Sequence, residues 1–308
     1  MKIAVVGAGG VGGYFGGMLA RAGEDVTFIA RGAHLAAMQR NGLKVESQIT
    51  PFSLASVKAT DDASSVGPVD LVLLSVKLYD VESAARASAP MVGPSTVVMP
   101  VQNGVDAPEI VAGALGGKGT IVGGIAYIAG QVEAPGVIRH NGMHARLVFG
   151  PLDGKPVPTL AAFATACNGA GFKGELVADA RTAMWEKFVF LATMSGMTAL
   201  TRHTIGPIRT NPTTRAMLVD SIDETVAVAR ALGVSLPADL PARTLALVDG
   251  LPVGGKASMA HDLDAGRRIE LPWLSGTVAR LGAANGVPTP IHRAITGALS
   301  LFVDGKRA

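Results

Sequence analysis

The sequence predicts an α/β fold in which a doubly wound parallel sheet with flanking helices precedes an all-helical C-terminal domain. Short apolar runs alternate with helical segments through the first half, for example KIAVVG at residues 2–7 and VDLVLLSVK at residues 69–77. Beyond about residue 177 the strand-like runs stop and helical periodicity continues to the end. Apolar runs of this length, separated by helices, are typical of parallel strands buried on both faces. We therefore expect residues 1–176 to form the sheet domain and residues 177–308 the helical domain.

The expected elements follow in a regular order. After the first strand, the spacing of Phe15, Leu19 and Ala22 indicates a helix that closes at Gly23. Further strands of the same parallel character are expected at residues 25–31, 69–77, 95–104, 119–130 and 145–151. In the second half, apolar residues at positions 218, 222, 226 and 229 form one face of a predicted helix.

The composition is that of a compact globular protein. The 308 residues are 48% hydrophobic and 17% charged, which is enough chain for two domains. The net charge of +3 is dispersed, without the basic block that nucleic-acid-binding proteins show. The uncharged run at residues 88–105 contains three prolines, so we expect no membrane-spanning helix. No targeting segment precedes the first strand, and we expect a cytoplasmic protein with neither nucleic acid nor membrane as a partner.

The thiol and imidazole groups give no sign of a metal site. The single cysteine, Cys167, excludes an internal disulfide and lies among alanines, so we expect a buried structural thiol. His140 and His144 are four residues apart, but Asn141 and Gly142 between them favour a turn over a helix that presents two ligands. With no third ligand evident, we expect no metal.

A glycine-rich motif follows the first strand directly. Residues Gly7, Ala8, Gly9, Gly10, Val11 and Gly12 match the pattern G-x-G-x-x-G between a strand and a helix. The first glycine permits a tight turn, the second lets the backbone approach a pyrophosphate, and the third allows close packing of helix and strand. The helix N-terminus then directs its N–H groups at the phosphates. The context favours a Rossmann-type dinucleotide site over an unliganded turn.

The end of the second strand favours NADP(H). An NAD site usually places an acidic residue there for the ribose hydroxyl, whereas this strand ends in Arg31. A guanidinium group suits a phosphate dianion. Glu24 and Asp25 precede the strand and are poorly placed for a ribose. A solvated surface arginine is the alternative interpretation of Arg31.

Two charged residues stand in apolar surroundings in the second half. Lys187 lies in an apolar predicted helix, where the alternatives are a snorkelling surface lysine and a desolvated amine that protonates a carbonyl oxygen. Glu270 is likewise followed by apolar residues. Spacing alone decides neither case.

As a whole the chain resembles the ketopantoate reductase (2-dehydropantoate 2-reductase) family. The resemblance rests on MKIAVVGAGGVGGYFGGMLARAG, Arg31, LLSVKLYD, VQNG, WEKF and SMAHDLDAGRRIE, and covers nearly the full length. It implies a dinucleotide domain followed by a helical domain, and the NADPH-dependent reduction of a 2-oxo acid in pantothenate and coenzyme A synthesis.

The resemblance also implies roles for individual residues. The cofactor contacts would fall on Gly7, Ala8, Gly9, Gly10, Val11, Gly12, Arg31, Lys77, Asn103 and Glu270. Lys187 would be the general acid, and Asn103 would lie near the nicotinamide and the substrate. Glu270 would anchor a substrate hydroxyl, and Ser258, twelve residues earlier, would bind the substrate carboxylate.

Two positions depart from the family pattern. Leu191 and Ser195 stand where family members often carry substrate-binding asparagines, four and eight residues after the lysine. Because leucine cannot form a hydrogen bond with a hydroxy acid, the pocket is expected to tolerate a more apolar 2-oxo acid. Reduction of ketopantoate is the favoured function. The alternatives are a reductase of another bulky 2-oxo acid and a non-catalytic NADP-binding sensor, and both a monomer and a homodimer stay open.

Overall fold

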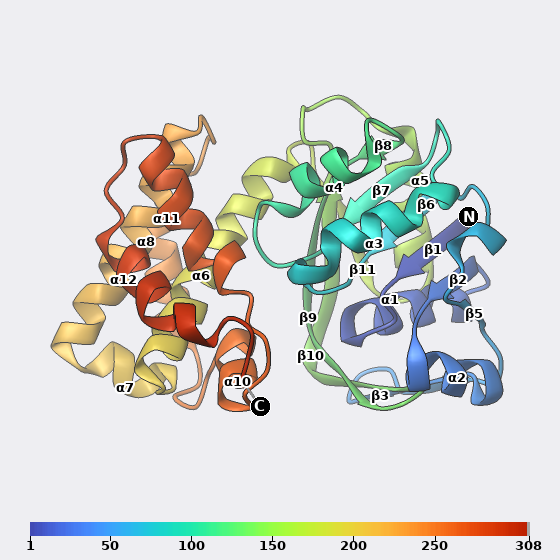
Figure 1. Ribbon diagram of the computed structural model, residues 1–308, viewed down its shortest axis with the longest axis horizontal. Coiled ribbons are helices and arrows are strands. Elements are labelled where there is room, and N and C mark those ends of the chain that lie inside the picture. The colour runs from blue at the N-terminus through green and yellow to red at the C-terminus, as the bar shows by residue number, and fades with distance from the viewer. Residues whose placement is uncertain (307–308) are drawn as a thin grey trace. The chain divides into compact units, whose positions relative to one another are not determined.

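The structure is a computed structural model that describes residues 1–306 (Figure 1). Contacts divide the chain into two units. The N-terminal unit consists of Met1–Gln102 and Ala107–Arg181, and the helical unit consists of Asn103–Asp106 and the chain from Thr182 onward. This division lies five residues after the boundary that the sequence predicts, residue 176, where strand β11 (Lys173–Leu176) ends.

The N-terminal unit contains the predicted doubly wound parallel sheet. Its strands lie in the order β5-β2-β1-β6-β7-β8, and every neighbouring pair is parallel. They are β1 (Lys2–Val6), β2 (Asp25–Ile29), β5 (Lys58–Thr60), β6 (Leu71–Leu74), β7 (Val97–Pro100) and β8 (Thr120–Ile121). The chain order reverses between β1 and β6, which is the switch point where sheets of this kind bind ligands.

The connections of this unit include both α-helices and short 3₁₀ turns. The α-helices are α1 (Gly10–Arg21), α2 (Gly32–Asn41), α3 (Val81–Ser88), α4 (Ala107–Leu115) and α5 (Pro158–Gly169). The 3₁₀ turns are η1 (Ala63–Ser65), η2 (Leu78–Asp80) and η3 (Ala89–Met91). Helix α1 ends just before Gly23, whose φ of +96° is the left-handed conformation that favours glycine after a helix.

A second sheet corrects part of the sequence prediction. Its strands lie in the order β11-β10-β3-β4, and β9 also pairs with β10. The strands are β3 (Leu43–Ser47), β4 (Phe52–Leu54), β9 (Gly123–Ala134) and β10 (Val137–Gly150). The runs at 119–130 and 145–151 were expected to be parallel strands, and this holds for β8 and for the pairing of β10 with β11 and β3. It is wrong for β9, which pairs antiparallel with β10. Only Pro135 and Gly136 separate them, and so short a connection forces a hairpin.

The turn expected at Asn141–Gly142 is also wrong. Both residues lie inside β10, where the pairing with β9 shifts register. Gly142 has a φ of +89°, a left-handed conformation that accommodates the irregular pairing. The strand β10 continues beyond this glycine.

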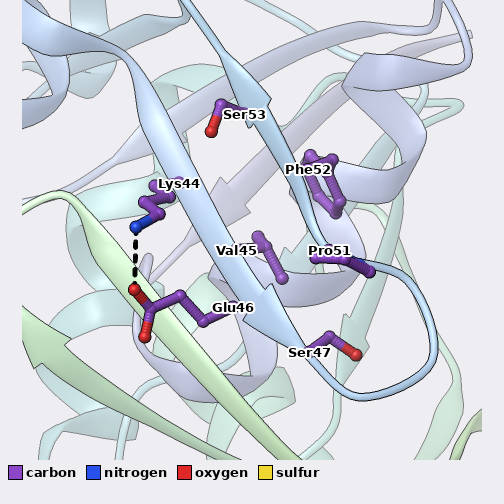
Figure 2. A pocket seen from close by; sticks show the side chains of 7 residues that line it. All are labelled: Lys44, Val45, Glu46, Ser47, Pro51, Phe52 and Ser53. Atoms are coloured by element: carbon purple, nitrogen blue, oxygen red, sulfur yellow. Dashed lines mark hydrogen bonds and ion pairs between the residues drawn. The ribbon is translucent and has the colours of Figure 1, made fainter.

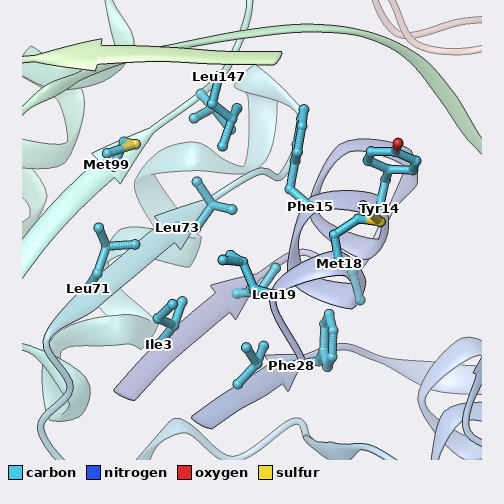
Figure 3. Packing of buried hydrophobic residues seen from close by; sticks show 14 of the residues in the cluster. Ile3, Tyr14, Phe15, Met18, Leu19, Phe28, Leu71, Leu73, Met99 and Leu147 are labelled. Atoms are coloured by element: carbon cyan, nitrogen blue, oxygen red, sulfur yellow. The ribbon is translucent and has the colours of Figure 1, made fainter. Parts of the chain in front are cut away.

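Helix α1 contacts both sheets of the unit. A Cβ at Gly16 would lie 2.7 Å from the ring of Phe28 in β2, and a Cβ at Gly13 would lie 2.7 Å from Ile138 in β10. Figure 3 shows Phe15 of this helix in the same apolar cluster as strand residues of the parallel sheet. The glycines of α1 therefore let the helix approach two sheets at once.

The helical unit has its own apolar core and follows the prediction. Its α-helices are α6 (Ala180–Thr201), α7 (Ile205–Thr210), α8 (Pro212–Ala231), α9 (Leu240–Gly250), α10 (Ser258–Asp264), α11 (Ser275–Ala284) and α12 (Pro290–Leu299). Two 3₁₀ turns, η4 (Leu271–Trp273) and η5 (Ser300–Phe302), complete it. The predicted apolar face of α8 is confirmed, since Leu218, Ile222, Val226 and Ala229 are all buried. Among the helices described here, none combines the length and the apolarity needed to span a membrane.

The contact of α1 with β9 makes a prediction about stability. A Cβ at Gly10 would lie 2.1 Å from the carbonyl oxygen of Gly130, so the backbone must shift to accept Gly10→Ala. We expect this substitution to lower the free energy of unfolding by about 2 kcal/mol, as overpacking typically does. Denaturant unfolding measures the change. Gly113→Ala, at an exposed site of α4 with open space, is the control and should leave stability unchanged or slightly raised. Equal stability of the two variants would contradict the close contact.

Candidate functional site

The glycine-rich turn lies at the switch point of the parallel sheet. Gly7 has a φ of +93°, which an L side chain rarely adopts. A Cβ at Gly12 would lie 2.2 Å from the carbonyl oxygen of Gly7, so α1 can pack this closely only with glycine there. A Cβ at Gly9 would meet no atom within 4 Å. The turn is therefore closely packed at its two ends and open in the middle.

The open part of the turn presents backbone donors. The carbonyl oxygen of Gly7 accepts a hydrogen bond from Ser75 Oγ at 2.7 Å, and that of Ala8 is 2.9 Å from His34 Nε2. Within residues 1–306, the N–H groups of Ala8 and Gly9 have no acceptor. Unpaired N–H groups before a helix N-terminus attract anions, so this turn is suited to hold phosphate.

Arg31 and Lys77 lie at the same edge of the parallel sheet as the turn. Arg31 directly precedes α2 and is exposed, and its guanidinium forms no hydrogen bond or ion pair with any described residue. Lys77 is exposed at the start of η2, just after β6. Asp25 begins β2 at the opposite edge, and its carboxylate accepts a hydrogen bond from Lys58 at 2.7 Å. The charge left for a ligand at the end of β2 is therefore positive.

Lys187 and Asn103 are brought together in the helical unit. Lys187 Nζ donates a hydrogen bond to Asn103 Oδ1 at 3.0 Å. The side chain lies in α6, and burial lowers its pKa to about 8. An amine with this pKa can give or take a proton near neutral pH, which the amine of an ordinary exposed lysine does poorly.

The segment that carries Asn103 is anchored at both ends. Asp106 accepts hydrogen bonds from Thr277 Oγ1 and, at 2.9 Å, from Arg280. Before Asn103, the buried Gln102 donates through Nε2 to the carbonyl oxygens of Leu74 at 2.8 Å and Val76 at 3.0 Å. Sequence reasoning missed these anchors, and the motif VQNG was the one signal for them.

Leu191 and Ser195 follow Lys187 by one and two turns of α6. Residues spaced by four lie on the same side of a helix, so all three share a face. Leu191 is half-buried and Ser195 is buried. The position that follows the amine along this face is therefore apolar.

Ser258 and Glu270 lie on separate elements of the helical unit. Ser258 is exposed at the first position of α10. Glu270 directly precedes η4 and is only 6% exposed. A carboxylate is a hydrogen-bond acceptor, so a substrate hydroxyl is one group that Glu270 can bind.

The groups considered for metal or thiol chemistry have structural roles. His140 uses both ring nitrogens, since Nδ1 is 2.9 Å from Ser47 Oγ and Nε2 is 3.2 Å from the carbonyl oxygen of His144. The imidazole also packs against the ring of Tyr14. Cys167 is buried in α5 as predicted, and burial raises the pKa of its thiol.

An open pocket of about 380 Å³ lies beside strands β3 and β4 (Figure 2). Its lining residues are Lys44, Val45, Glu46, Ser47, Pro51, Phe52 and Ser53. Lys44 Nζ and Glu46 Oε1 are 2.8 Å apart, so the two charges of the pocket largely satisfy each other. None of the site residues predicted from the sequence lines it.

The N-terminal unit has a glycine-rich turn at the switch point of a doubly wound sheet, and the helical unit of the same chain carries a desolvated lysine. This arrangement is that of a dinucleotide-dependent oxidoreductase. Comparison with known families makes this specific. Residues 3–154 match the model "Ketopantoate reductase PanE/ApbA", and residues 179–302 match its C-terminal counterpart. The chain belongs to the ketopantoate reductase PanE/ApbA family, as the sequence resemblance indicated. The family acts on the CH–OH/C=O couple and implies a nicotinamide dinucleotide cofactor.

Individual relatives are similar over nearly their whole length. A 2-dehydropantoate 2-reductase of Mesorhizobium japonicum is 33% identical, with 96% of this chain and 95% of the relative covered. The crystal structure of a PanE/ApbA family ketopantoate reductase from Ralstonia eutropha superposes with a TM-score of 0.88 at 34% identity and covers 98% of both chains. A 2-dehydropantoate 2-reductase from Geobacter metallireducens gives a TM-score of 0.89 at 29% identity, with 98% of this chain and 99% of that chain covered.

Proposed function

We propose that the protein catalyses the NADPH-dependent reduction of a 2-oxo acid to a 2-hydroxy acid. The favoured reaction is the conversion of 2-dehydropantoate to pantoate in pantothenate and coenzyme A synthesis. The observation that carries the proposal is the 3.0 Å contact of Lys187 Nζ with Asn103 Oδ1, made by an amine whose pKa is about 8. Family membership and the names of the relatives at about 30% identity support the choice of substrate.

The N-terminal unit fits the cofactor. Open space at Gly9 and the unpaired N–H groups of Ala8 and Gly9 suit a pyrophosphate. The exposed guanidinium of Arg31 would bind the 2′-phosphate that distinguishes NADPH from NADH. Lys77 would add positive charge at the same edge of the sheet.

The helical unit would hold the substrate and supply the proton. When bound, NADPH supplies the hydride that reduces the carbonyl carbon. Lys187, in its ammonium form, gives a proton to the carbonyl oxygen as negative charge develops there. Asn103 fixes the direction of the ammonium group through the hydrogen bond that it accepts. In this proposal Ser258 binds the carboxylate of the substrate and Glu270 anchors its hydroxyl group, which holds the carbonyl in line.

The role of Lys187 predicts the effect of both mutation and pH. Lys187→Met should lower kcat for 2-oxo acid reduction about 10²- to 10⁴-fold, the usual contribution of a general acid. Because the ammonium form is the donor, kcat/KM for reduction should fall as the pH rises above the pKa of about 8. For oxidation of the hydroxy acid the neutral amine is the acceptor, so that rate should rise toward the same pH. Steady-state absorbance assays of NADPH in both directions measure these profiles.

The exposed Lys118 provides the control. Lys118→Met should leave both profiles unchanged. A wild-type kcat in the Lys187→Met variant would contradict the role of Lys187 as the general acid.

Arg31 predicts the choice of cofactor. Arg31→Ala should raise KM for NADPH about tenfold or more, because it removes a charged hydrogen-bonding partner of a phosphate, and should change KM for NADH by less than about twofold. Arg40→Ala, which removes an exposed arginine from helix α2, is the matched control. An equal rise in KM for both cofactors would mean that Arg31 does not bind the 2′-phosphate.

A second candidate is a reductase of another bulky 2-oxo acid, and Leu191 is the observation that favours it. The matched substrates are 2-dehydropantoate and 3,3-dimethyl-2-oxobutanoate, which lacks the hydroxyl group. Leu191→Asn should raise the kcat/KM ratio of the first over the second about two- to tenfold, the worth of one hydrogen bond. Leu191→Met should leave the ratio as it is in the wild type. An unchanged ratio in Leu191→Asn would place this residue outside the substrate pocket.

The same assay separates enzyme from sensor. A sensor would bind NADPH but oxidise it with no member of a panel of 2-oxo acids. Rapid oxidation with 2-dehydropantoate supports the favoured reaction, and oxidation with other 2-oxo acids alone supports the second candidate.

A further inference from the structure

His34 joins the glycine-rich turn to the β9–β10 hairpin. The residue lies in the first turn of α2, three positions after Arg31. Its Nδ1 accepts a hydrogen bond from the backbone N–H of Gly136 at 3.0 Å, and its Nε2 is 2.9 Å from the carbonyl oxygen of Ala8. A nitrogen that accepts carries no proton, so the proton of the neutral ring is on Nε2, which donates to Ala8. The half-buried ring thus has a partner on each side, one in the turn and one in the hairpin.

The bond to Ala8 fixes the direction of the next N–H group. The carbonyl of Ala8 and the N–H of Gly9 belong to one planar trans peptide, so they point in opposite directions. Holding this oxygen at His34 therefore turns the N–H of Gly9 away from the imidazole. That N–H is one of the two in the turn with no acceptor among residues 1–306.

Ser75 does the same for the preceding peptide. Its hydroxyl donates to the carbonyl oxygen of Gly7 at 2.7 Å, which sets the direction of the N–H of Ala8. Two consecutive peptide planes are thus held by side chains from other elements. Glycine-rich turns are otherwise free to rotate their peptides, and a free turn loses entropy when it orders around a ligand.

We propose that His34 is a positioning residue for the cofactor, which acts through the Ala8–Gly9 peptide to hold the N–H of Gly9 ready for a phosphate oxygen. It makes no contact with the cofactor itself. This inference rests on the cofactor site proposed above.

Gly136, which donates to Nδ1 of His34, is itself held in place. Gly136 lies in the two-residue turn of the β9–β10 hairpin, with a φ of +78°. The same hairpin touches the glycine-rich motif a second time, where the backbone of Gly130 packs on Gly10. A rotation of the imidazole would break its bond to Gly136, so the ring is held against the turn from behind.

Two amide variants separate the two bonds of the ring. In His34→Gln the side-chain amide nitrogen takes the place of Nε2 and can still donate to Ala8. In His34→Asn the amide reaches only the place of Nδ1, so it can accept from Gly136 but cannot reach Ala8. The proposal therefore expects the glutamine variant, and not the asparagine variant, to keep the function of the histidine.

The experiment measures NADPH binding by fluorescence titration and kinetics with the full chain. We expect His34→Asn to raise Kd and KM for NADPH about tenfold, with kcat at saturating NADPH and KM for the 2-oxo acid within about twofold of the wild type. His34→Gln should stay within about twofold throughout. Gln39→Ala is the control, since it removes a different bond of α2, from Gln39 Nε2 to the carbonyl oxygen of Ala59, and should leave NADPH binding unchanged.

Several results would overturn the proposal. One is that His34→Asn binds NADPH as tightly as the wild type. Another is that both variants bind NADPH equally weakly and also have a lowered Tm, because this would indicate a general structural role of His34. A measurement on the wild type serves even where a variant fails to fold. Nitrogen NMR of the imidazole should find the neutral ring with its proton on Nε2, and a proton on Nδ1 would refute the geometry. If the wild type binds no NADPH at all, the proposed function fails, and the ring NMR still reports on His34.

Discussion

Close backbone packing around helix α1 is the constraint on which the N-terminal unit depends. Side chains at Gly10, Gly12, Gly13 or Gly16 would collide with a strand, with the preceding turn or with a second sheet. Without side chains at these positions, the helix contacts the parallel sheet and the β9–β10 hairpin at once. The glycine-rich turn at its N-terminus is consequently held on several sides. A sequence that looks flexible residue by residue becomes one of the more restrained parts of the fold.

The two units contribute different chemistry to the proposed reaction. The N-terminal unit offers backbone donors and an arginine whose guanidinium has no partner among the described residues, both suited to anions. The helical unit offers an amine that burial brings toward a neutral pKa, next to a carboxamide oxygen. The first set serves binding and the second serves proton transfer. In the proposed reaction the N-terminal unit therefore binds the cofactor, and the helical unit binds the substrate.

The sequence predicted what depends on local pattern. The parallel sheet, the helical second half, the buried face of α8 and the buried Cys167 all followed from periodicity and composition, and the structure confirms them. The antiparallel pairing of β9 with β10 was not predicted, because the turn signal Pro135–Gly136 between the two runs was not used. His34, Ser75 and Gln102 were missed, since each bonds to a backbone carbonyl at least 26 residues away along the chain. The roles of Lys187, Ser258, Glu270, Leu191 and Ser195 in catalysis and substrate binding stay predictions.

The segment Asn103–Asp106 belongs to the helical unit although it is encoded in the middle of the N-terminal one. Its Asn103 meets Lys187 of α6, and its Asp106 is bound by side chains of α11. The two units are therefore not separable by a single cut in the gene. A chimera of two relatives spliced near residue 176 would pair the lysine of one parent with the asparagine segment of the other. Natural recombination within the family faces the same restriction. These four residues have to change in step with Lys187, 84 positions after Asn103, and with Thr277 and Arg280, 171 and 174 positions after Asp106.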